Sequence, residues 1–480
     1  MAQVEQKRLQ RMAVMRSPAP GQRVPDGRLR RGALLVCCAG AFMAFLDTTI
    51  VNIAFPDIER TFHASAGLSA LSWVVNGYNV VIAALLVPAG RAADRLGRRR
   101  AFVTGLLLFT GASAGCAAAS SVGMLITLRL VQAAGAAVVV PTSLALLLPQ
   151  FERSRRLSAV AAWGAASALA AGIGPSLGAV LVQTYSWRAV FLVNIPIGLI
   201  GAWGASRVLA EERESGPLPD IPGAGLLCAG IALIALGIVK GNEWGWGSAA
   251  TLACLIGSVV LLTIVGARCV RHSEPVIDPR LLRVRDAALA NLGALLLSIA
   301  LYAAILNNVL FLTGVWHWSV LRAGLAISPA ALITAGVARP AGELAERYGA
   351  RAIIVPGALL YLVGMLLLSW GAGRSPSFFV HWLPGAAIAG VGMGLALPNL
   401  IGAALAGAPE EKLATGSGLN AAARQLGGVL GVALLVSILA ASGPHALAAH
   451  RYGWDLSAGF ALAAAASALT LSGRRRVEML

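Results

Sequence analysis

Charge is scarce in this sequence. Only 12% of its residues are Asp, Glu, Lys or Arg, whereas a soluble domain carries roughly a quarter. Hydrophobic residues make up 58% of the 480 positions, and one globule of that size cannot hide so much apolar surface, so lipid must cover part of it. Backbone amides in lipid must be bonded within the protein, which leaves helices or closed barrels. Because the apolar stretches are continuous rather than alternating, the sequence predicts an all-α membrane protein.

Signatures of catalysis and of cofactor binding are also missing. There is no G-x-x-x-x-G-K-[ST] loop that would hold ATP phosphates. No nucleophile–base constellation or histidine metal spacing stands out. The cysteines show neither zinc nor disulfide spacing; they are Cys37, Cys38, Cys116, Cys228, Cys254 and Cys269. We therefore expect no enzyme, no metal and no bound cofactor, and an ion gradient or the gradient of the substrate would drive any transport.

Fourteen apolar stretches are long enough to cross a bilayer, since a spanning helix needs about 20 residues. The predicted spans are 33–55, 68–89, 101–120, 123–148, 158–182, 188–209, 222–240, 248–268, 286–313, 322–342, 351–371, 381–405, 414–441 and 454–472. Arginine clusters such as 98–100 and 474–476 fall in alternate loops, which places these loops and both termini in the cytoplasm. Tryptophans at the opposite loops predict an aromatic belt; they are Trp187, Trp244, Trp246, Trp316, Trp318, Trp370, Trp382 and Trp454.

The net charge of +17 raises the question of a nucleic acid partner. The basic residues sit in short clusters between apolar spans and not on one face of a polar domain, so nucleic acid is not the expected partner. Cationic helix ends held at an anionic cytoplasmic leaflet explain the charge better, and membrane lipid is the expected neighbour.

One loop pattern occurs twice, after the second and after the tenth predicted span. Segments 90–99 and 342–351 both carry Gly, an acid at +4, Arg at +5, Gly at +7 and Arg at +9. We expect a conformational loop motif made of Gly90, Asp94, Arg95, Gly97, Arg98, Gly342, Glu346, Arg347 and Gly349. Its glycines allow a tight turn and close helix approach, and its carboxylates can cap a helix or pair with an arginine across the halves. The alternative is a tight basic turn that recurs by chance.

A second repeated pattern occurs in the fourth and twelfth spans. The fourth span carries Gly135 and Pro141, and the twelfth carries Gly392 and Pro398 with the same spacing. Duplication predicts two parallel halves that rock about a central site, which is a transporter architecture. The expected parts are a basic cytoplasmic segment 1–32, six-helix bundles 33–209 and 286–472, an inserted helix pair with linkers over 210–285, and a cytoplasmic tail 473–480. The inserted pair is poor in polar groups, so we expect it off the transport path.

Charge inside a membrane span is costly and usually functional, and three charged residues far from the ends of predicted spans are good candidates. Asp47 and Arg129 lie at similar depths, and Arg424 lies near the middle of the thirteenth span. A carboxylate in a low-dielectric site beside an arginine can load and release a proton, which predicts a proton-coupling role for Asp47 and Arg129. The alternative is a static pair that only fixes helix packing.

Polar residues in several spans are candidates for a substrate cavity. They are Thr48, Asn52, Asn76, Asn79, Gln132, Asn307, Asn308, Asn420 and Arg424. The alternative for each asparagine is an interhelical contact, which is common in membrane bundles. In the fifth span, Gly174, Pro175 and Gly178 suit a conformational hinge or a sealed helix interface; the alternative is an ordinary small-residue contact.

These segments resemble the major facilitator superfamily, and within it the fourteen-helix drug:proton antiporter branch. Residues 90–99 resemble its signature loop, and 46–56 resemble the first-span motif of the branch, with Phe55 where Leu is usual. Residues 125–137 resemble the span-four motif whose arginine is implicated in proton coupling, with Ala133 for Gly, and 174–179 resemble the span-five antiporter motif, with Ala179 for Gly. Residues 186–196 and 418–427 are also typical of the branch.

The resemblance implies a major-facilitator fold with two extra central helices and proton-driven export of drugs, toxic compounds or antibiotics across a bacterial cytoplasmic membrane. The expected partners are a small-molecule substrate and protons; the sequence leaves open whether the protein works as a monomer or with accessory efflux proteins. Two rivals are a facilitator or importer of a small metabolite and a membrane sensor that does not transport. Because Asp47 stands nearly alone beside Arg129 and Arg424, the sequence favours neutral or anionic amphipathic cargo.

Overall fold

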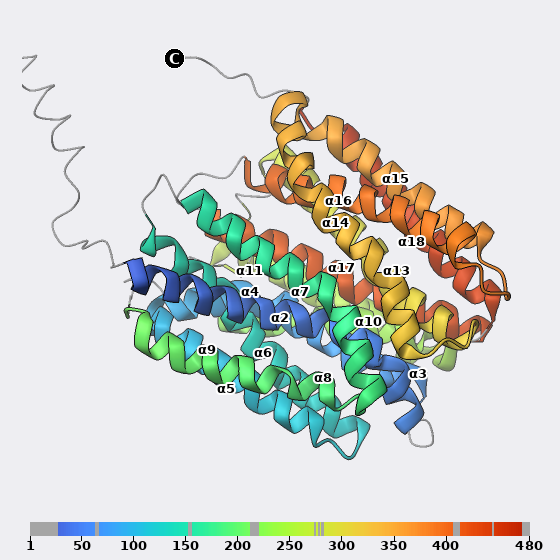
Figure 1. Ribbon diagram of the computed structural model, residues 1–480, viewed down its shortest axis with the longest axis horizontal. Coiled ribbons are helices and arrows are strands. Elements are labelled where there is room, and N and C mark those ends of the chain that lie inside the picture. The colour runs from blue at the N-terminus through green and yellow to red at the C-terminus, as the bar shows by residue number, and fades with distance from the viewer. Residues whose placement is uncertain are drawn as a thin grey trace, which may run out of the picture.

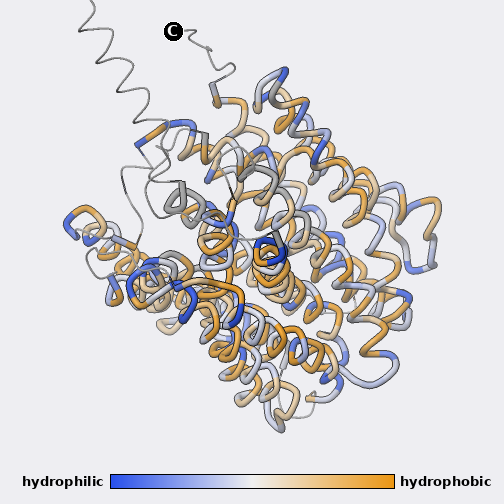
Figure 2. Tube along the Cα trace, turned by 60° about the vertical axis from the view of Figure 1, so that its left-hand side comes forward, coloured by the Kyte–Doolittle hydropathy of each residue, from blue (hydrophilic) through white to orange (hydrophobic). Residues whose placement is uncertain are grey.

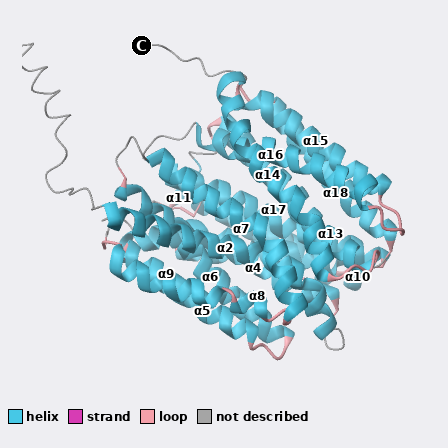
Figure 3. Ribbon diagram, in the orientation of Figure 1, coloured by secondary structure: helices cyan, strands magenta, loops and turns pink. Residues whose placement is uncertain are grey.

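The computed structural model describes residues 27–62, 67–151, 156–211, 220–272, 275–276, 279, 283–406, 413–443 and 446–472. Within these ranges the chain is helical and carries no strand (Figure 3), as the continuous apolar stretches predict. Most of the basic segment 1–32 and the whole tail 473–480 lie outside the described residues.

The helices of the N-terminal half lie together across the lower part of Figure 1. They are α2 (Gly27–Phe62), α3 (Leu68–Leu71), α4 (Trp73–Leu96), α5 (Arg98–Ala117), α6 (Val122–Leu147), α7 (Arg156–Thr184), α8 (Ala189–Leu192) and α9 (Asn194–Val208), with a 3-10 turn at Leu148–Gln150. Ser121 begins α6 by accepting a hydrogen bond from the Met124 amide, so this helix has a side-chain cap at its first turn.

A helix pair and a second group of helices follow. The pair is α10 (Ile221–Trp244) and α11 (Ala249–Arg271). The second group is α13 (Arg285–Gly314), α14 (Val320–Tyr348), α15 (Ala350–Gly371), a π-helical turn at Phe378–Trp382, α16 (Leu383–Ala406), α17 (Leu413–Ser442) and α18 (Leu447–Leu469). The two large groups meet along two seams, α4 with α17 and α7 with α14, and α10 packs against both α4 and α17.

A helix lies over each of the predicted spans, and hydrophobic residues line most of these helices (Figure 2). Among the described residues, twelve helices are long and apolar enough to cross a membrane. The helices α7 and α18, which cover the fifth and fourteenth predicted spans, are not among them. The number of fourteen crossings therefore stays a prediction.

The two halves repeat one close helix approach. A Cβ added to Gly135 in α6 would lie 2.9 Å from the Gly105 oxygen of α5, and one added to Gly392 in α16 would lie 2.6 Å from the Gly357 oxygen of α15. Only glycine fits at such a distance. The glycine repeated in spans four and twelve thus makes the same backbone contact in both groups of helices.

The duplicated loop turns at equivalent glycines. Gly97, between α4 and α5, has φ of 108°, and Gly349, between α14 and α15, has φ of 89°, a region that other residues rarely adopt. Asp94 pairs with Arg98 at 2.7 Å, so in this copy the carboxylate binds an arginine of its own half rather than of the other half. The side chain of Glu346, its counterpart, lies outside the described residues.

The predicted hinge in α7 forms a close helix contact. The helix is continuous through Pro175, and a Cβ at Gly178 would lie 2.7 Å from Ile50 Cγ1 of α2, while Gly174 faces the Thr49 side chain. Small residues therefore let α7 approach α2 closely. A sealed interface and an ordinary small-residue contact both have this geometry, and bending at Pro175 stays a prediction.

The seam between α7 and α14 includes a tight contact near the start of α14. A Cβ at Gly324, close to the start of α14, would lie 2.7 Å from the Pro175 oxygen, and the Ser176 and Ser328 hydroxyls bond across the seam. Further along α14, a Cβ at Gly336 would meet no atom within 4 Å. The halves thus close on each other where α7 ends and α14 begins.

The predicted tryptophan belt is largely wrong. Trp187, Trp316, Trp318, Trp382 and Trp454 are buried, whereas Trp244, Trp246 and Trp370 are exposed. In the C-terminal group the buried rings surround Phe311, which stacks on Trp382 at 5.9 Å between ring centroids and meets Trp454 at 4.9 Å. Tryptophan combines a large apolar body with one N–H donor, which suits a core as well as an interface.

The inserted helix pair connects the two large groups at the end of α10. Asn242 donates to the Ser437 carbonyl of α17 at 2.5 Å, and Ser69 of α3 donates to Glu243. Lys240 pairs with the same glutamate. The pair therefore contacts both groups through polar bonds; its absence from the transport path stays a prediction.

Acidification is expected to loosen the junction of α10 and α11. Asp220, just before α10, accepts hydrogen bonds from the Gly223 amide at 2.9 Å and from Arg268 Nε at 2.8 Å. Burial opposes ionisation, but these bonds hold the pKa of Asp220 below its ordinary value. Their stabilisation is complete above pH ~4 and is lost as the pH falls through the lower folded pKa.

Hydrogen exchange at the Gly223 amide, corrected for its intrinsic rate, should accelerate through this acid window. In Asp220→Asn the acceleration should disappear, because no carboxylate is left to titrate. Equal protection of the wild-type amide on both sides of the window would contradict the prediction.

Candidate functional site

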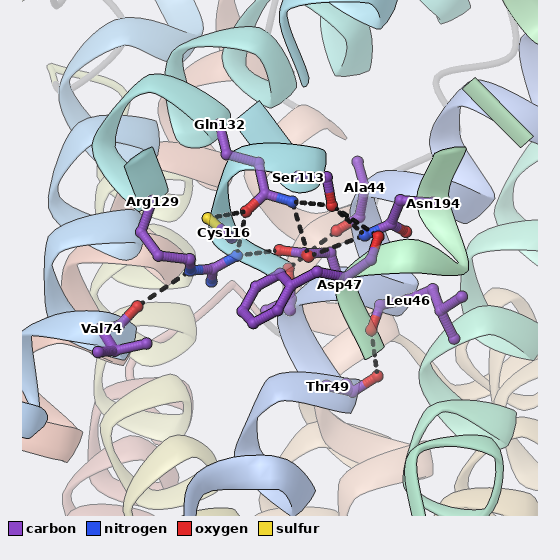
Figure 4. A network of polar contacts seen from close by, with 12 residues as sticks. Ala44, Leu46, Asp47, Thr49, Val74, Ser113, Cys116, Arg129, Gln132 and Asn194 are labelled. Carbon is purple, nitrogen blue, oxygen red and sulfur yellow. Dashed lines mark hydrogen bonds and ion pairs between the residues drawn. The ribbon is translucent and has the colours of Figure 1, made fainter. Parts of the chain in front are cut away.

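Asp47 lies on α2 with no exposed surface, and side chains from two other helices, α6 and α9, bond to it (Figure 4). Arg129 Nη1 of α6 donates to Asp47 Oδ2 at 2.5 Å. Gln132 Nε2 of α6 and Asn194 Nδ2 of α9 donate to Oδ1 at 3.0 and 3.2 Å. Three donors thus hold the ionised carboxylate in an otherwise apolar interior.

Arg129 is equally well partnered and is 1% exposed. Besides Asp47, its Nη1 donates to Gln132 Oε1 at 2.7 Å and its Nε to the Val74 carbonyl of α4 at 3.1 Å. The guanidinium carbon lies 4.0 Å from the centroid of the Tyr78 ring, a cation–π geometry. The sequence prediction that Asp47 and Arg129 lie at similar depths is matched by a direct ion pair.

Ser113 and Asn194 complete the network, and sequence reasoning did not single them out. Ser113 Oγ of α5 accepts from Gln132 and from Asn194, both at 3.1 Å, and donates to the Phe191 carbonyl at 2.9 Å. Asn194 lies within segment 186–196, whose resemblance to the family was the available signal. Ser113 lies in a helix rich in small residues, and nothing in the sequence around it indicated a functional role.

Protonation of Asp47 would change the ion pair and the hydrogen bonds of this network. If Asp47 takes up a proton, Arg129 loses its counter-charge, and the donors Gln132 and Asn194 lose an anionic acceptor. Since the four helices α2, α5, α6 and α9 supply these groups, the protonation state of one carboxyl affects how the N-terminal helices are held together.

The other predicted cavity residues of this half differ in their partners. Thr48 and Asn52 bond backbone carbonyls of their own helix, at 3.0 and 2.8 Å. Gln132 belongs to the Asp47 network. Asn76 is fully buried, and neither its oxygen nor its nitrogen has a partner among the described residues; the same holds for the oxygen of Asn79.

In the C-terminal group, the predicted residues fall into two sets. Asn307 donates to the His450 carbonyl at 2.9 Å, and Asn308 accepts from Trp454 Nε1 at 2.8 Å, so both connect α13 to α18. His450 itself is buried in α18. Asn420 and Arg424 lie on α17 instead.

Residues 37–432 match the Major Facilitator Superfamily, which is most of the sequence. This chain belongs to the Major Facilitator Superfamily. The major-facilitator fold predicted from the signature loop and the span motifs is therefore confirmed. The protein is a multi-pass membrane transporter of that superfamily.

Its relatives in the superfamily carry names that refer to drugs and antibiotics. The chain is 34% identical over 431 residues to the cephamycin export protein of Amycolatopsis lactamdurans, which covers 88% of each chain. It is 30% identical over 461 residues to the methylenomycin A resistance protein of Streptomyces coelicolor, covering 95% of this chain and 93% of the relative. A multidrug resistance protein of Mycobacterium tuberculosis is 33% identical over 410 residues, covering 85% and 75%.

Solved structures of other superfamily members share the fold. The peptide-transporter-family protein PepTSo superposes with a TM-score of 0.68 at 15% identity, over 93% of this chain and 98% of that one. The human organic anion transporter MFSD10 gives 0.61 at 17% identity, over 92% and 99%. At these identities the likeness concerns the fold alone.

Proposed function

We propose that this protein is a proton-coupled antiporter that exports drugs or antibiotics from the bacterial cytoplasm by alternating access. The observation that carries the proposal is the buried Asp47–Arg129 pair at 2.5 Å, in a chain whose superfamily relatives are named for export and resistance. An ionisable pair inside a membrane protein is by default part of an ion pathway.

In this mechanism Asp47 is the proton carrier and Arg129 its counter-charge. A proton from the external side neutralises Asp47, which weakens its bond to Arg129 and frees the N-terminal helices to rearrange; release of that proton to the cytoplasm restores the pair. One proton then enters for each turnover in which cargo leaves. Gln132 and Asn194 position the carboxylate through their bonds to Oδ1.

The predicted orientation indicates on which side of the membrane the tight contact between α7 and α14 lies. With both termini in the cytoplasm, the tight contact of Gly324 with Pro175 lies toward the external surface. The conformation described here would then be closed to the outside, and cargo would enter from the cytoplasm. Alternating access requires this contact to open during export.

Proteoliposomes loaded with a pH-sensitive dye test the proposal against its rivals. Addition of a panel of antibiotics should trigger proton flux opposite to drug movement, and an imposed pH gradient should drive uphill drug transport. Drug movement without proton flux would instead support a facilitator. Neither drug movement nor proton flux, with correctly folded protein, would favour a sensor without transport.

A further inference from the structure

Two arginines lie within the helices near the centre of this protein, and their surroundings differ sharply. Arg129 is bonded to an aspartate, a glutamine and a backbone carbonyl. Arg424, in the middle of α17, makes no hydrogen bond or ion pair to any described residue, and its Nε is buried without a partner. One arginine is thus fully compensated by the protein and the other is not.

The Arg424 side chain is half-buried, and a guanidinium partly removed from water favours a counter-charge or hydrogen-bond acceptors. The uncharged ring of Tyr302 on α13 packs against α17 at Gly428, one turn after Arg424. The carboxyl of Asp47 is already bound by Arg129. The described part of the protein therefore offers Arg424 no anion, which leaves its guanidinium able to bind an anionic ligand.

Further polar groups without partners surround this arginine. Asn420, one turn before it, is 1% exposed and donates to Asn291 of α13 at 3.1 Å, while its own oxygen has no partner. The side-chain oxygen of the adjacent Gln425 is also buried and unpartnered. Buried polar atoms are nearly always satisfied in folded proteins, so their gathering on one stretch of α17 indicates a binding site.

The same stretch of α17 lies where the two halves meet. Ala421 packs against the hydrophobic cluster of the N-terminal helices, which includes Tyr78 and Trp163. On the other side, the Tyr302 ring of α13 lies 3.3 Å from where a Cβ of Gly428 would stand. This stretch of α17 therefore lies between hydrophobic side chains of both halves, which suits a ligand with an apolar body and a single charged end.

We propose that Arg424 binds the carboxylate of the exported compound, and that the physiological cargo is an amphipathic organic acid. The inference rests on the proposed export function and names its substrate class. A guanidinium presents paired N–H donors that match a carboxylate in two parallel hydrogen bonds. The unpartnered side-chain oxygens of Asn420 and Gln425 would accept hydrogen bonds from polar groups of the same ligand.

Equilibrium binding to the full-length protein in lipid nanodiscs tests the site without requiring transport. The probes are 1-naphthaleneacetate and its neutral amide, 1-naphthaleneacetamide, which share one aromatic body and differ in charge. The wild type should bind the acetate at least tenfold more tightly than the amide, and Arg424→Gln should reduce this ratio to about one. Arg424→Lys, which keeps the charge but not the paired donors, should lie between them.

Two controls make the result specific. Arg339→Gln removes an exposed arginine of α14 and should leave the ratio as in the wild type. Arg424→Gln should not lower the melting temperature of the ligand-free protein, because it removes a charge that has no partner; a fall of several degrees would mark the arginine as structural and overturn the proposal.

Other outcomes overturn it as clearly. An acetate-to-amide ratio that stays at ten or more in Arg424→Gln would place the carboxylate elsewhere. Binding of chloride that excludes the acetate would identify an inorganic anion as the occupant. In proteoliposomes, proton-driven export of the amide but not of the acetate would leave the export function standing and remove the anion site, whereas tight acetate binding without any coupled flux would remove the export function alone.

Discussion

Asp47→Asn is expected to reduce proton-driven export to the level of protein-free vesicles. An amide cannot take up and release a proton in the physiological range, whereas it can still accept a hydrogen bond from Arg129. The same change removes the carboxylate bonded to the buried guanidinium of Arg129, and breaking such a pair from one side costs about 3–5 kcal/mol. Both losses should be measured, export as dye-monitored proton flux and stability as thermal unfolding in detergent.

A double variant separates the two roles of the pair. Asp47→Leu combined with Arg129→Met replaces both charges with apolar side chains of similar volume, which often restores the stability that a single replacement removes. We expect near wild-type melting of this variant but no proton-driven export. If the double variant exports with proton coupling, the pair only fixes helix packing, and Asp47 is not the carrier.

A milder change tests the positioning groups around the same carboxylate. Asn194→Leu removes one donor to Asp47 Oδ1 and one donor to Ser113, yet it leaves the ion pair in place. Since hydrogen bonds to the ionised form favour that form, the pH profile of export should shift toward higher pH while the maximal rate changes less. A uniform loss at every pH would indicate a purely structural role.

The sequence predicted the helices because continuous apolar segments have few alternatives in lipid. It predicted the Asp47–Arg129 pair because intramembrane charges are rare and must find each other. It could not distinguish the asparagines that connect helices, such as Asn307, from those left without partners, such as Asn76, because both read as one amide in an apolar run. That distinction depends on which residues of distant helices lie opposite.

Tryptophan shows the same limit. Trp370 and Trp454 both stand near the end of a predicted span, yet one is 73% exposed and the other is fully buried beside Phe311. Their residue type and depth are alike, so a belt and a core are equally consistent with the sequence. The wrong belt prediction also means that arginine placement alone supports the predicted orientation, which makes the side of the closed seam a point to test directly.

Gly324→Val is expected to open that seam. A Cβ at Gly324 would lie 2.5 Å from the Ala179 Cβ and 2.7 Å from the Pro175 oxygen, so any side chain forces α14 away from α7. Overpacking of this kind costs about 1–3 kcal/mol, and the cost falls only on the closed state. The ratio of closed to open molecules should therefore fall roughly 5- to 150-fold.

Spin labels at residues 180 and 325, both exposed beside the seam, measure the change in a background without native cysteines. The distance distribution should move to longer values in Gly324→Val and export should slow, because the cycle needs the seam to close again. The matched control is Gly336→Val on the same helix, where a Cβ would meet no atom within 4 Å. If both variants keep the wild-type distances and rates, the contact of Gly324 with α7 is not the gate; if Gly324→Val alone shifts them, the tight end of the α7–α14 seam is the barrier that alternating access must open.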